Sequence, residues 1–352
     1  MNFASDNSVG ASPRILQALL DANAGAAAAY GADPWSARAG ALLAETFEAD
    51  CAVWLVATGT AANALALATL VPPYGAAFCH ADAHVSEDEC GAPEMFTGGA
   101  KIVGLPGRDG KLTPAALAAG LARYPKGAVK SVQPAAISIS QATECGTLYS
   151  RAEVAALAAA AKAAGLRVHM DGARFSNAIA AGAGTPAELT WKAGVDVLTL
   201  GATKDGALAC EAIVVFDRAL APALDFARKR AGHTLSKGRL LGAQMCAWLE
   251  GGHWLELARR ANAAAARLAA GLAAIPGVEL AWPAQANEIF PVLPKAKVAA
   301  LRAAGAVFYD WTAAAIPARI AEETGRQTIR LVTSFATEDA EIDRFLALAG
   351  AP

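Results

Sequence analysis

"VDVLTLGATKDGALAC", Val195 to Cys210, begins as an apolar run typical of a buried strand and ends in a turn of small residues around one lysine, Lys204. A long cation at the end of a strand has three ordinary uses: a solvated side chain, a phosphate ligand, or an amine whose chemistry the protein uses. This stretch alone does not distinguish the three uses of the lysine. The order of the neighbouring segments has to decide among them.

Similar apolar runs recur along the first two thirds of the chain and alternate with alanine-rich helical segments. The alternation predicts an α/β fold in which a mainly parallel sheet lies between helices. Several of the helices open with serine or threonine, which favour helix starts. Strands are predicted at Val53–Val56, Ala76–Cys79, Lys101–Gly104, Ala135–Ser140, Leu166–Met170, Val195–Leu200 and Ala212–Phe216, and helices at Gly59–Leu70, Thr113–Arg123 and Ser150–Ala164.

The last third of the chain has a different order of segments. A long helical stretch from Arg239 to Ala274 precedes short strand-like runs and a final helix from Glu338. This change predicts a second, smaller α+β domain, so we expect a large domain at residues 1–245 and a small one at residues 246–352. Strands of the small domain are predicted near Val278–Ala281, Glu288–Leu293, Val307–Tyr309 and Thr328–Thr333.

Composition restricts the classes of partner. Among 352 residues, 55% are hydrophobic and 18% charged, and the formal net charge is -2. This balance gives no reason to expect nucleic acid or an anionic membrane, so a small soluble substrate is favoured. The opening "MNFASDNSVGASPR" lacks the features of a signal peptide, which predicts a cytoplasmic protein. Six scattered cysteines without a CxxC pair predict reduced thiols and no metal site.

Two charged residues follow neighbouring predicted strands. Asp171 opens "DGAR" after the strand at Leu166–Met170, and Lys204 comes 33 residues later, about one crossover unit further on. Because open parallel sheets bind ligands at the carboxyl ends of their strands, both side chains are expected to face one pocket. A simple buried ion pair explains these two residues equally well.

A third element is "ATGTAANALAL", Ala57 to Leu67, in which a strand ends, a Gly59-Thr60 turn follows and a helix begins. Free backbone N–H groups at such a helix start favour an anion, although an ordinary helix cap is the alternative. Pyridoxal phosphate (PLP) requires a lysine for its Schiff base, a carboxylate beside its pyridine nitrogen and an anion cradle for its phosphate. Gly59-Thr60, Asp171 and Lys204 supply these in the chain order of the aminotransferase-like fold.

Eight stretches spread over the chain carry a resemblance to a known family. They are "FASDN" (3–7), "AYGADPW" (29–35), "GTAAN" (59–63), "ADAHVSEDECGAPE" (81–94), "QATECGT" (141–147), "HMDGARFSNA" (169–178), "GATKDG" (201–206) and "RKRAGHTLSKGR" (228–239). On these stretches the sequence resembles the low-specificity L-threonine aldolases of the aldolase and β-eliminating lyase group over essentially its whole length. The resemblance implies a PLP enzyme that reversibly cleaves β-hydroxy-α-amino acids into glycine and an aldehyde, usually as a homotetramer.

The resemblance assigns roles to further residues. His84 matches the histidine that stacks on the cofactor ring, and Glu89 matches its acidic neighbour; the alternatives are a structural histidine and a solvated charge. Thr203, before the lysine, is expected beside the cofactor. For the substrate carboxylate, the resemblance implies Arg174, Arg330 and Ser5, since an arginine fork suits a carboxylate.

Three residues resemble segments that reach a neighbouring subunit's site. They are Tyr30, Asp33 and Lys229, the last directed toward phosphate or substrate. A surface ion pair for Arg174 and an edge-strand charge for Arg330 remain as alternatives.

Other reaction classes stay open at this point. A β-eliminating lyase or an aminotransferase would share Lys204 and Asp171, and a non-catalytic relative of the fold would use Lys204 in an ion pair. The aldehyde side chain is open as well, because a permissive pocket accepts threonine, allo-threonine or phenylserine-like substrates.

Overall fold

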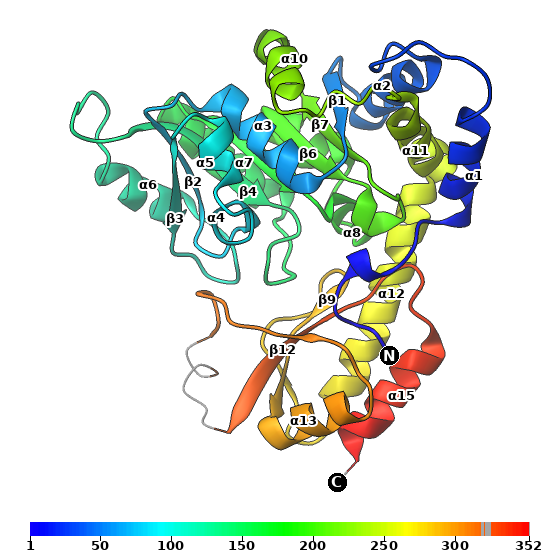
Figure 1. Ribbon diagram of the computed structural model, residues 1–352. Helices are drawn as coiled ribbons and strands as arrows, with labels where there is room; N and C mark the ends of the chain where they lie inside the picture. The colour runs from blue at the N-terminus through cyan, green and yellow to red at the C-terminus, as the bar shows by residue number, and fades with distance from the viewer. Residues whose placement is uncertain (318–319, 321–324, 352) are drawn as a thin grey trace.

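The computed structural model describes residues 1–317, 320 and 325–351 of the chain. It divides into a larger part built on a seven-stranded sheet and a smaller part built on a second sheet (Figure 1). The long helix α12 (His253–Ala273) contacts elements of both parts, α8 (Phe175–Ala180) in the larger one and β8 (Glu279–Leu280) in the smaller one. The fold is thus α/β with an appended α+β unit, as the alternation of segments predicts.

The larger sheet has the strand order β1-β7-β6-β5-β4-β2-β3. Its strands run parallel except β7, which is antiparallel to both of its neighbours. Successive residues point to opposite faces, so Leu198 packs in the core of one face and Val197 in the core of the other. The strands are β1 (Ala52–Val56), β2 (Gly75–His80), β3 (Lys101–Leu105), β4 (Gln133–Ser140), β5 (Arg167–Gly172), β6 (Val197–Gly201) and β7 (Glu211–Val215).

Helices cover both faces of this sheet (Figure 1). The side chains of Thr58, Thr113 and Ser150 cap three of them, as the sequence predicts for serine and threonine at helix starts. The helical elements of this part, besides α8, are η1 (Asp6–Ser8), α1 (Pro13–Ala22), α2 (Pro34–Phe47), α3 (Gly59–Leu70), α4 (His84–Glu87), α5 (Ala92–Phe96), α6 (Pro114–Ala122), α7 (Arg151–Ala163), α9 (Pro186–Leu189), η2 (Trp191–Ala193), η3 (Thr203–Asp205), η4 (Arg218–Leu220), α10 (Ala221–Arg230) and α11 (Arg239–Leu249).

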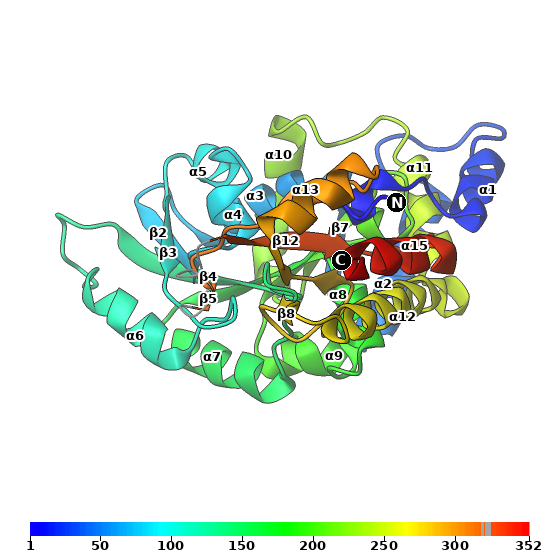
Figure 2. The same cartoon turned by 90° about the horizontal axis from the view of Figure 1, so that it is seen from below.

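The smaller part is an antiparallel sheet that shares one hydrophobic core with α12, α13 and α15. Its strand order is β11-β12-β10-β8, with β9 paired to β12. Seen from below, β12, α13 and α15 lie in front of the larger sheet (Figure 2). Its remaining elements are η5 (Glu250–Gly252), β9 (Glu288–Ile289), β10 (Pro291–Pro294), α13 (Lys295–Ala303), β11 (Tyr309–Asp310), β12 (Arg326–Val332) and α15 (Asp339–Gly350).

Most predicted strands and helices are confirmed, with three differences. The helical stretch from Arg239 to Ala274 is interrupted where Gly251 and Gly252 adopt left-handed backbone angles, which separates α11 from α12. The run Glu288–Leu293 forms two short strands, β9 and β10. Short helices such as α4 and α8 were not predicted, because four to six residues carry little periodic signal.

The N-terminal segment joins the two parts. Phe3 is fully buried in the core of the smaller part, and its backbone bonds Val307 and Val332. A few residues later, η1 contacts η3, the turn that carries Lys204. A division of the chain at residues 245/246 stays a prediction. No helix in the described part of the chain is long and apolar enough to cross a membrane.

Candidate functional site

A pocket of about 280 Å³ opens at the carboxyl edge of the larger sheet. Both Asp171 and Lys204 line it, as the strand order predicts, because β5 and β6 are adjacent and parallel. The other lining residues come from η1, the start of α3, the α4 region, the loops after β4 and β5, the strands β6 and β7, and the turn η3. They are Asn7, Ala57, Thr58, Gly59, Thr60, Asn63, His84, Glu89, Glu144, Ala173, Thr199, Thr203 and Glu211.

The Asp171 carboxylate is buried and held at the end of β5. Its Oδ1 accepts a hydrogen bond of 3.0 Å from the backbone N–H of Ala173, and its Oδ2 accepts one of 2.9 Å from Asn63 Nδ2. The Lys204 amine, by contrast, makes no hydrogen bond and no close ion pair within the described part of the chain. A fixed carboxylate and an unengaged amine therefore share one cavity.

A close backbone approach brings the two residues together. A Cβ atom at Gly201, the last residue of β6, would lie 2.7 Å from the carbonyl oxygen of Ala173 and 3.0 Å from Glu211 Oε2. Glycine alone therefore lets β6 end so close to the loop that follows Asp171.

The start of α3 forms one wall of the pocket. Thr58 is the N-cap, since its side chain accepts a hydrogen bond from the backbone N–H of Ala61. Gly59 and Thr60 follow as the first helical residues and line the cavity. First-turn N–H groups and the helix dipole make this wall suited to an anion.

A chain of hydrogen bonds leads from His84 to Asp171. His84 Nδ1 lies 2.8 Å from Glu89 Oε1, and the same oxygen accepts a hydrogen bond of 2.8 Å from Asn63 Nδ2. The hydrogen bond with Glu89 raises the pKa of His84, while burial raises the pKa of Glu89. Since an ionised carboxylate only accepts, Nδ1 donates to Glu89 and leaves Nε2 available to accept a proton.

Glu211, which sequence reasoning missed, is a buried carboxyl group at the start of β7. Burial raises its pKa to about 7, against the opposing effects of Thr203 and Lys204. Thr203 also closes the turn, since its Oγ1 accepts a hydrogen bond of 3.1 Å from the backbone N–H of Cys210. The available signal was a glutamate opening the otherwise apolar run "EAIVV".

Arg174 is buried in an ion-pair cluster between the two parts of the chain. Its Nε and Nη2 donate to the two Asp6 oxygens at 2.8 and 3.2 Å, and its Nη1 lies 3.3 Å from Glu288 Oε1. Burial acts to raise the pKa of Asp6, but Arg174 outweighs it, so this pKa lies below its usual value. Neither carboxylate was predicted, because the three residues lie far apart in sequence.

Arg330 lies on β12 near the same cluster. Its guanidinium stacks 4.7 Å from the Trp311 ring centre, and its Nε has no hydrogen-bond partner among the residues that the structure describes. Burial raises the pKa of Glu288 and outweighs the opposing effect of the two arginines, Arg174 and Arg330. Ser5 caps η1 through a 3.1 Å hydrogen bond from the backbone N–H of Asn7, next to Asp6. These residues lie beside the pocket and do not line it.

Three predicted residues lie apart from this pocket within one chain. Asp33 is buried as the N-cap of α2, where it accepts hydrogen bonds from the backbone N–H and hydroxyl of Ser36. Tyr30 is exposed, and the Lys229 amine lies 5.1 Å from its ring centre. Tyr30 and Lys229 therefore lie on the surface, whereas the Asp33 carboxylate is engaged.

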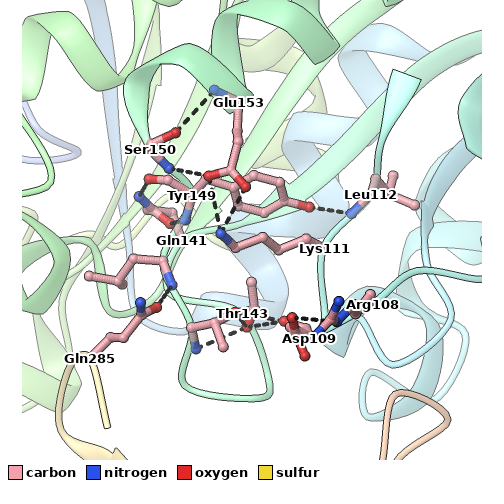
Figure 3. Close-up of polar contacts among 12 residues, drawn as sticks. Arg108, Asp109, Lys111, Leu112, Gln141, Thr143, Tyr149, Ser150, Glu153 and Gln285 are labelled. Carbon is pink, nitrogen blue, oxygen red and sulfur yellow. Dashed lines mark hydrogen bonds and ion pairs between the residues drawn. The ribbon is translucent and has the colours of Figure 1, made fainter. Parts of the chain in front are cut away.

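The loop after β4 brings Glu144 to the pocket, and a polar network anchors it (Figure 3). Gln141 Nε2 donates to the carbonyl oxygen of Tyr149, and the backbone N–H of Tyr149 donates to Gln141 Oε1, each at 2.9 Å. These two hydrogen bonds close the base of the loop. The Tyr149 hydroxyl accepts a 2.6 Å hydrogen bond from the backbone N–H of Leu112. The two ends of the loop are thereby fixed, which limits the region over which Glu144 can move.

Known proteins resemble this chain over nearly its full length. The beta-eliminating lyase family model matches residues 2–294. A low specificity L-threonine aldolase of Pseudomonas sp. (strain NCIMB 10558) is 43% identical over 350 residues, covering 98% of this chain and 96% of the relative. One of Pseudomonas aeruginosa is 46% identical over 314 residues, covering 88% and 89%.

Solved structures agree with this relationship. A threonine aldolase of Leishmania major superimposes with a TM-score of 0.91 and 33% identity, covering 99% of this chain and 98% of that one. A serine palmitoyltransferase of Sphingomonas wittichii reaches a TM-score of 0.72 at 18% identity, covering 99% and 86%, and so shares the fold. With a matching family model over most of its residues, this chain belongs to the beta-eliminating lyase family.

Proposed function

We propose that the chain is a PLP-dependent aldolase that reversibly cleaves L-threonine, L-allo-threonine and related β-hydroxy-α-amino acids into glycine and an aldehyde. The observation that carries the proposal is the meeting of the Lys204 amine and the Asp171 carboxylate in one pocket beside the start of α3. The 43% and 46% identities with low specificity L-threonine aldolases support this carbon–carbon lyase reaction.

The residues of the pocket fit PLP. The unengaged Lys204 amine would hold its aldehyde, the first turn of α3 at Gly59 and Thr60 its phosphate, and Asp171 its ring nitrogen. Thr203 lines the same cavity beside Lys204. When bound, PLP supplies an electron sink for the electron pair released as the Cα–Cβ bond breaks.

His84 and Glu89 are the proposed proton-handling pair. With Nδ1 donating to Glu89 at 2.8 Å, Nε2 of His84 is free to take the proton of the substrate β-hydroxyl. The Glu89 carboxylate then stabilises the imidazolium that forms. In the reverse direction the same nitrogen returns the proton.

Arg174 and Arg330 are proposed to bind the substrate carboxylate, with Ser5 close by. Arg330 supports this role because its Nε lacks a partner among the described residues. Arg174 already donates to Asp6, so it would act mainly through its Nη1, which lies 3.3 Å from Glu288. Entry of a substrate carboxylate therefore has to compete with Glu288 for the same guanidinium.

Other parts of the proposal concern the whole assembly. Tyr30 and Lys229 are proposed to serve a neighbouring subunit's site in a homotetramer, and Asp33 is proposed to hold their segment near that site as the N-cap of α2. A cytoplasmic location stays a prediction. Phenylserine-like substrates are included in the proposed range, because a permissive aldehyde pocket rejects added bulk only weakly.

The test is to incubate the purified chain and PLP with L-threonine or L-allo-threonine and to measure acetaldehyde and glycine. Equal amounts of both products are expected. A four-carbon keto acid without glycine would instead support β-elimination or amino-group transfer, and no product from either substrate would overturn the aldolase proposal. Borohydride reduction followed by peptide mapping tests separately whether PLP is attached at Lys204.

A further inference from the structure

Asn63 joins the two acidic groups of the pocket through a single nitrogen. It lies on the second turn of α3 and is only 2% exposed. Its Nδ2 lies 2.9 Å from Asp171 Oδ2 and 2.8 Å from Glu89 Oε1. A primary amide nitrogen carries two N–H groups, so each carboxylate receives one of them.

The other end of the amide supports this orientation. Asn63 Oδ1 is buried and has no hydrogen-bond partner within the described part of the chain. A flipped amide would aim that oxygen at two carboxylates, which accept hydrogen bonds and repel it. An unpaired buried carbonyl is unfavourable. The two hydrogen bonds that the Asn63 N–H groups donate therefore have to hold the amide in this orientation.

The consequences reach His84. Glu89 accepts from both Asn63 and His84 on the same oxygen, so the amide helps to keep this buried carboxyl group ionised beside Asp171. An ionised Glu89 in turn holds the imidazole. Asp171 and Glu144 are the other charged groups that act on His84.

We propose that Asn63 is a positioning residue that fixes the Asp171 and Glu89 carboxylates together and thereby links the proton affinity of His84 to the group that faces the cofactor nitrogen. This role rests on the proposed function of the pocket. It differs from a space-filling role, because it depends on the two N–H groups and not on the shape of the side chain.

The decisive variant is Asn63→Leu, which keeps the branched shape of the side chain but has no hydrogen-bond donors. Asn63→Ala is measured in its place if the leucine variant fails to fold. The first readout is the titration of His84 in the full chain without added PLP, by NMR of labelled histidine. The chain has five histidines, so the NMR signal of His84 is identified as the one that is missing from the spectrum of His84→Gln. The midpoint is expected to fall by about one pH unit, because Glu89 without its donor protonates more readily.

The second readout is the affinity for PLP, from the visible absorption of the bound cofactor. It is expected to weaken roughly tenfold, since Asp171 loses one charged hydrogen bond. Asn177→Leu is the matched control, because this buried asparagine also donates through Nδ2, to Asn262 at 3.0 Å, away from both carboxylates. The control should leave the His84 midpoint unchanged.

A double-mutant cycle tests whether Asn63 acts on His84 through Glu89. In a Glu89→Gln background, replacing Asn63 should no longer move the His84 midpoint. An unchanged midpoint in the folded single variants overturns the proposal, as does an equal shift with and without Glu89. A change in only one of the two readouts also overturns it, because both carboxylates must depend on the same nitrogen. None of these outcomes requires aldolase activity, so failure of the proposed reaction would be recognised separately.

Discussion

The His84–Glu89–Asn63–Asp171 chain and the Asp6–Arg174–Glu288 cluster are two polar regions with different constructions. The first lies at one edge of one sheet, and a neutral amide separates its two carboxylates by hydrogen bonds of 2.8 and 2.9 Å. The second joins the N-terminal segment, the loop after β5 and strand β9 through full charges. The comparison teaches that the sheet edge is built to adjust protonation, whereas the cluster is built to hold separate segments together.

The largest expected effect tests the sheet edge at its unengaged amine. Lys204→Ala is expected to lower aldolase activity at least about a thousandfold, since no other group can replace a covalent amine. Borohydride should no longer fix PLP to the chain, as measured by mass spectrometry. Lys130→Ala, at an exposed position, is the control and should keep both properties. A PLP adduct of unchanged yield in Lys204→Ala would contradict the assignment.

Asp171→Ala is expected to come next. Activity should fall on the order of a hundredfold or more, because the developing charge loses its fixed partner. Lysine and PLP should still combine, so the visible band of bound PLP is expected to remain, although with weaker binding. Parallel steady-state and absorption measurements check this. If the rate at saturating PLP is unchanged while PLP binding weakens, Asp171 serves cofactor binding alone, and the sheet edge does not adjust protonation through this residue.

Asp6→Asn tests the cluster. The variant keeps the shape of the side chain but removes a charge from a buried pair, so the free energy of unfolding at pH 7 should fall by about 3 kcal/mol. The pKa of Asp6 is lowered in the fold, so its contribution is present above its unfolded pKa and is lost as the pH falls through the lower folded pKa. The cost should therefore shrink in acid. Denaturant unfolding at several pH values measures it, and a cost that grows toward acid would refute this account.

An effect of opposite sign, which is smaller once lost contacts are subtracted, is expected at the sheet edge. Glu211 has a pKa raised to about 7 by burial, so its stabilising contribution is complete below the unfolded pKa and is lost as the pH rises through 7. Glu211→Gln does not titrate and should therefore gain stability relative to the parent chain between pH 5 and 8, by up to about 3 kcal/mol before any lost contact is subtracted. Thermal unfolding of both chains without PLP, at several pH values, measures this gain in stability. A difference that does not change with pH would show that Glu211 is ionised throughout.

The sheet strands and the helix α3 could be predicted because their signals are local: short apolar runs, a threonine cap and a small-residue turn. Lys204 and Asp171 followed from strand order, since neighbouring parallel strands end at one edge. Asn63 lay within a recognised motif but received no role, because the sequence does not reveal which way an amide points. Glu211 gave only a weak signal at the start of a strand.

The sequence by itself determined the α/β order, the lysine and carboxylate at adjacent strand ends, and the family, because these depend on spacing along the chain. Only the tertiary structure decided that Arg174 is held by Asp6 and Glu288, which are separated from it by more than a hundred residues. It also decided that one amide serves two carboxylates. Hydrogen bonds and buried ion pairs depend on distances of about 3 Å, which spacing in sequence cannot fix.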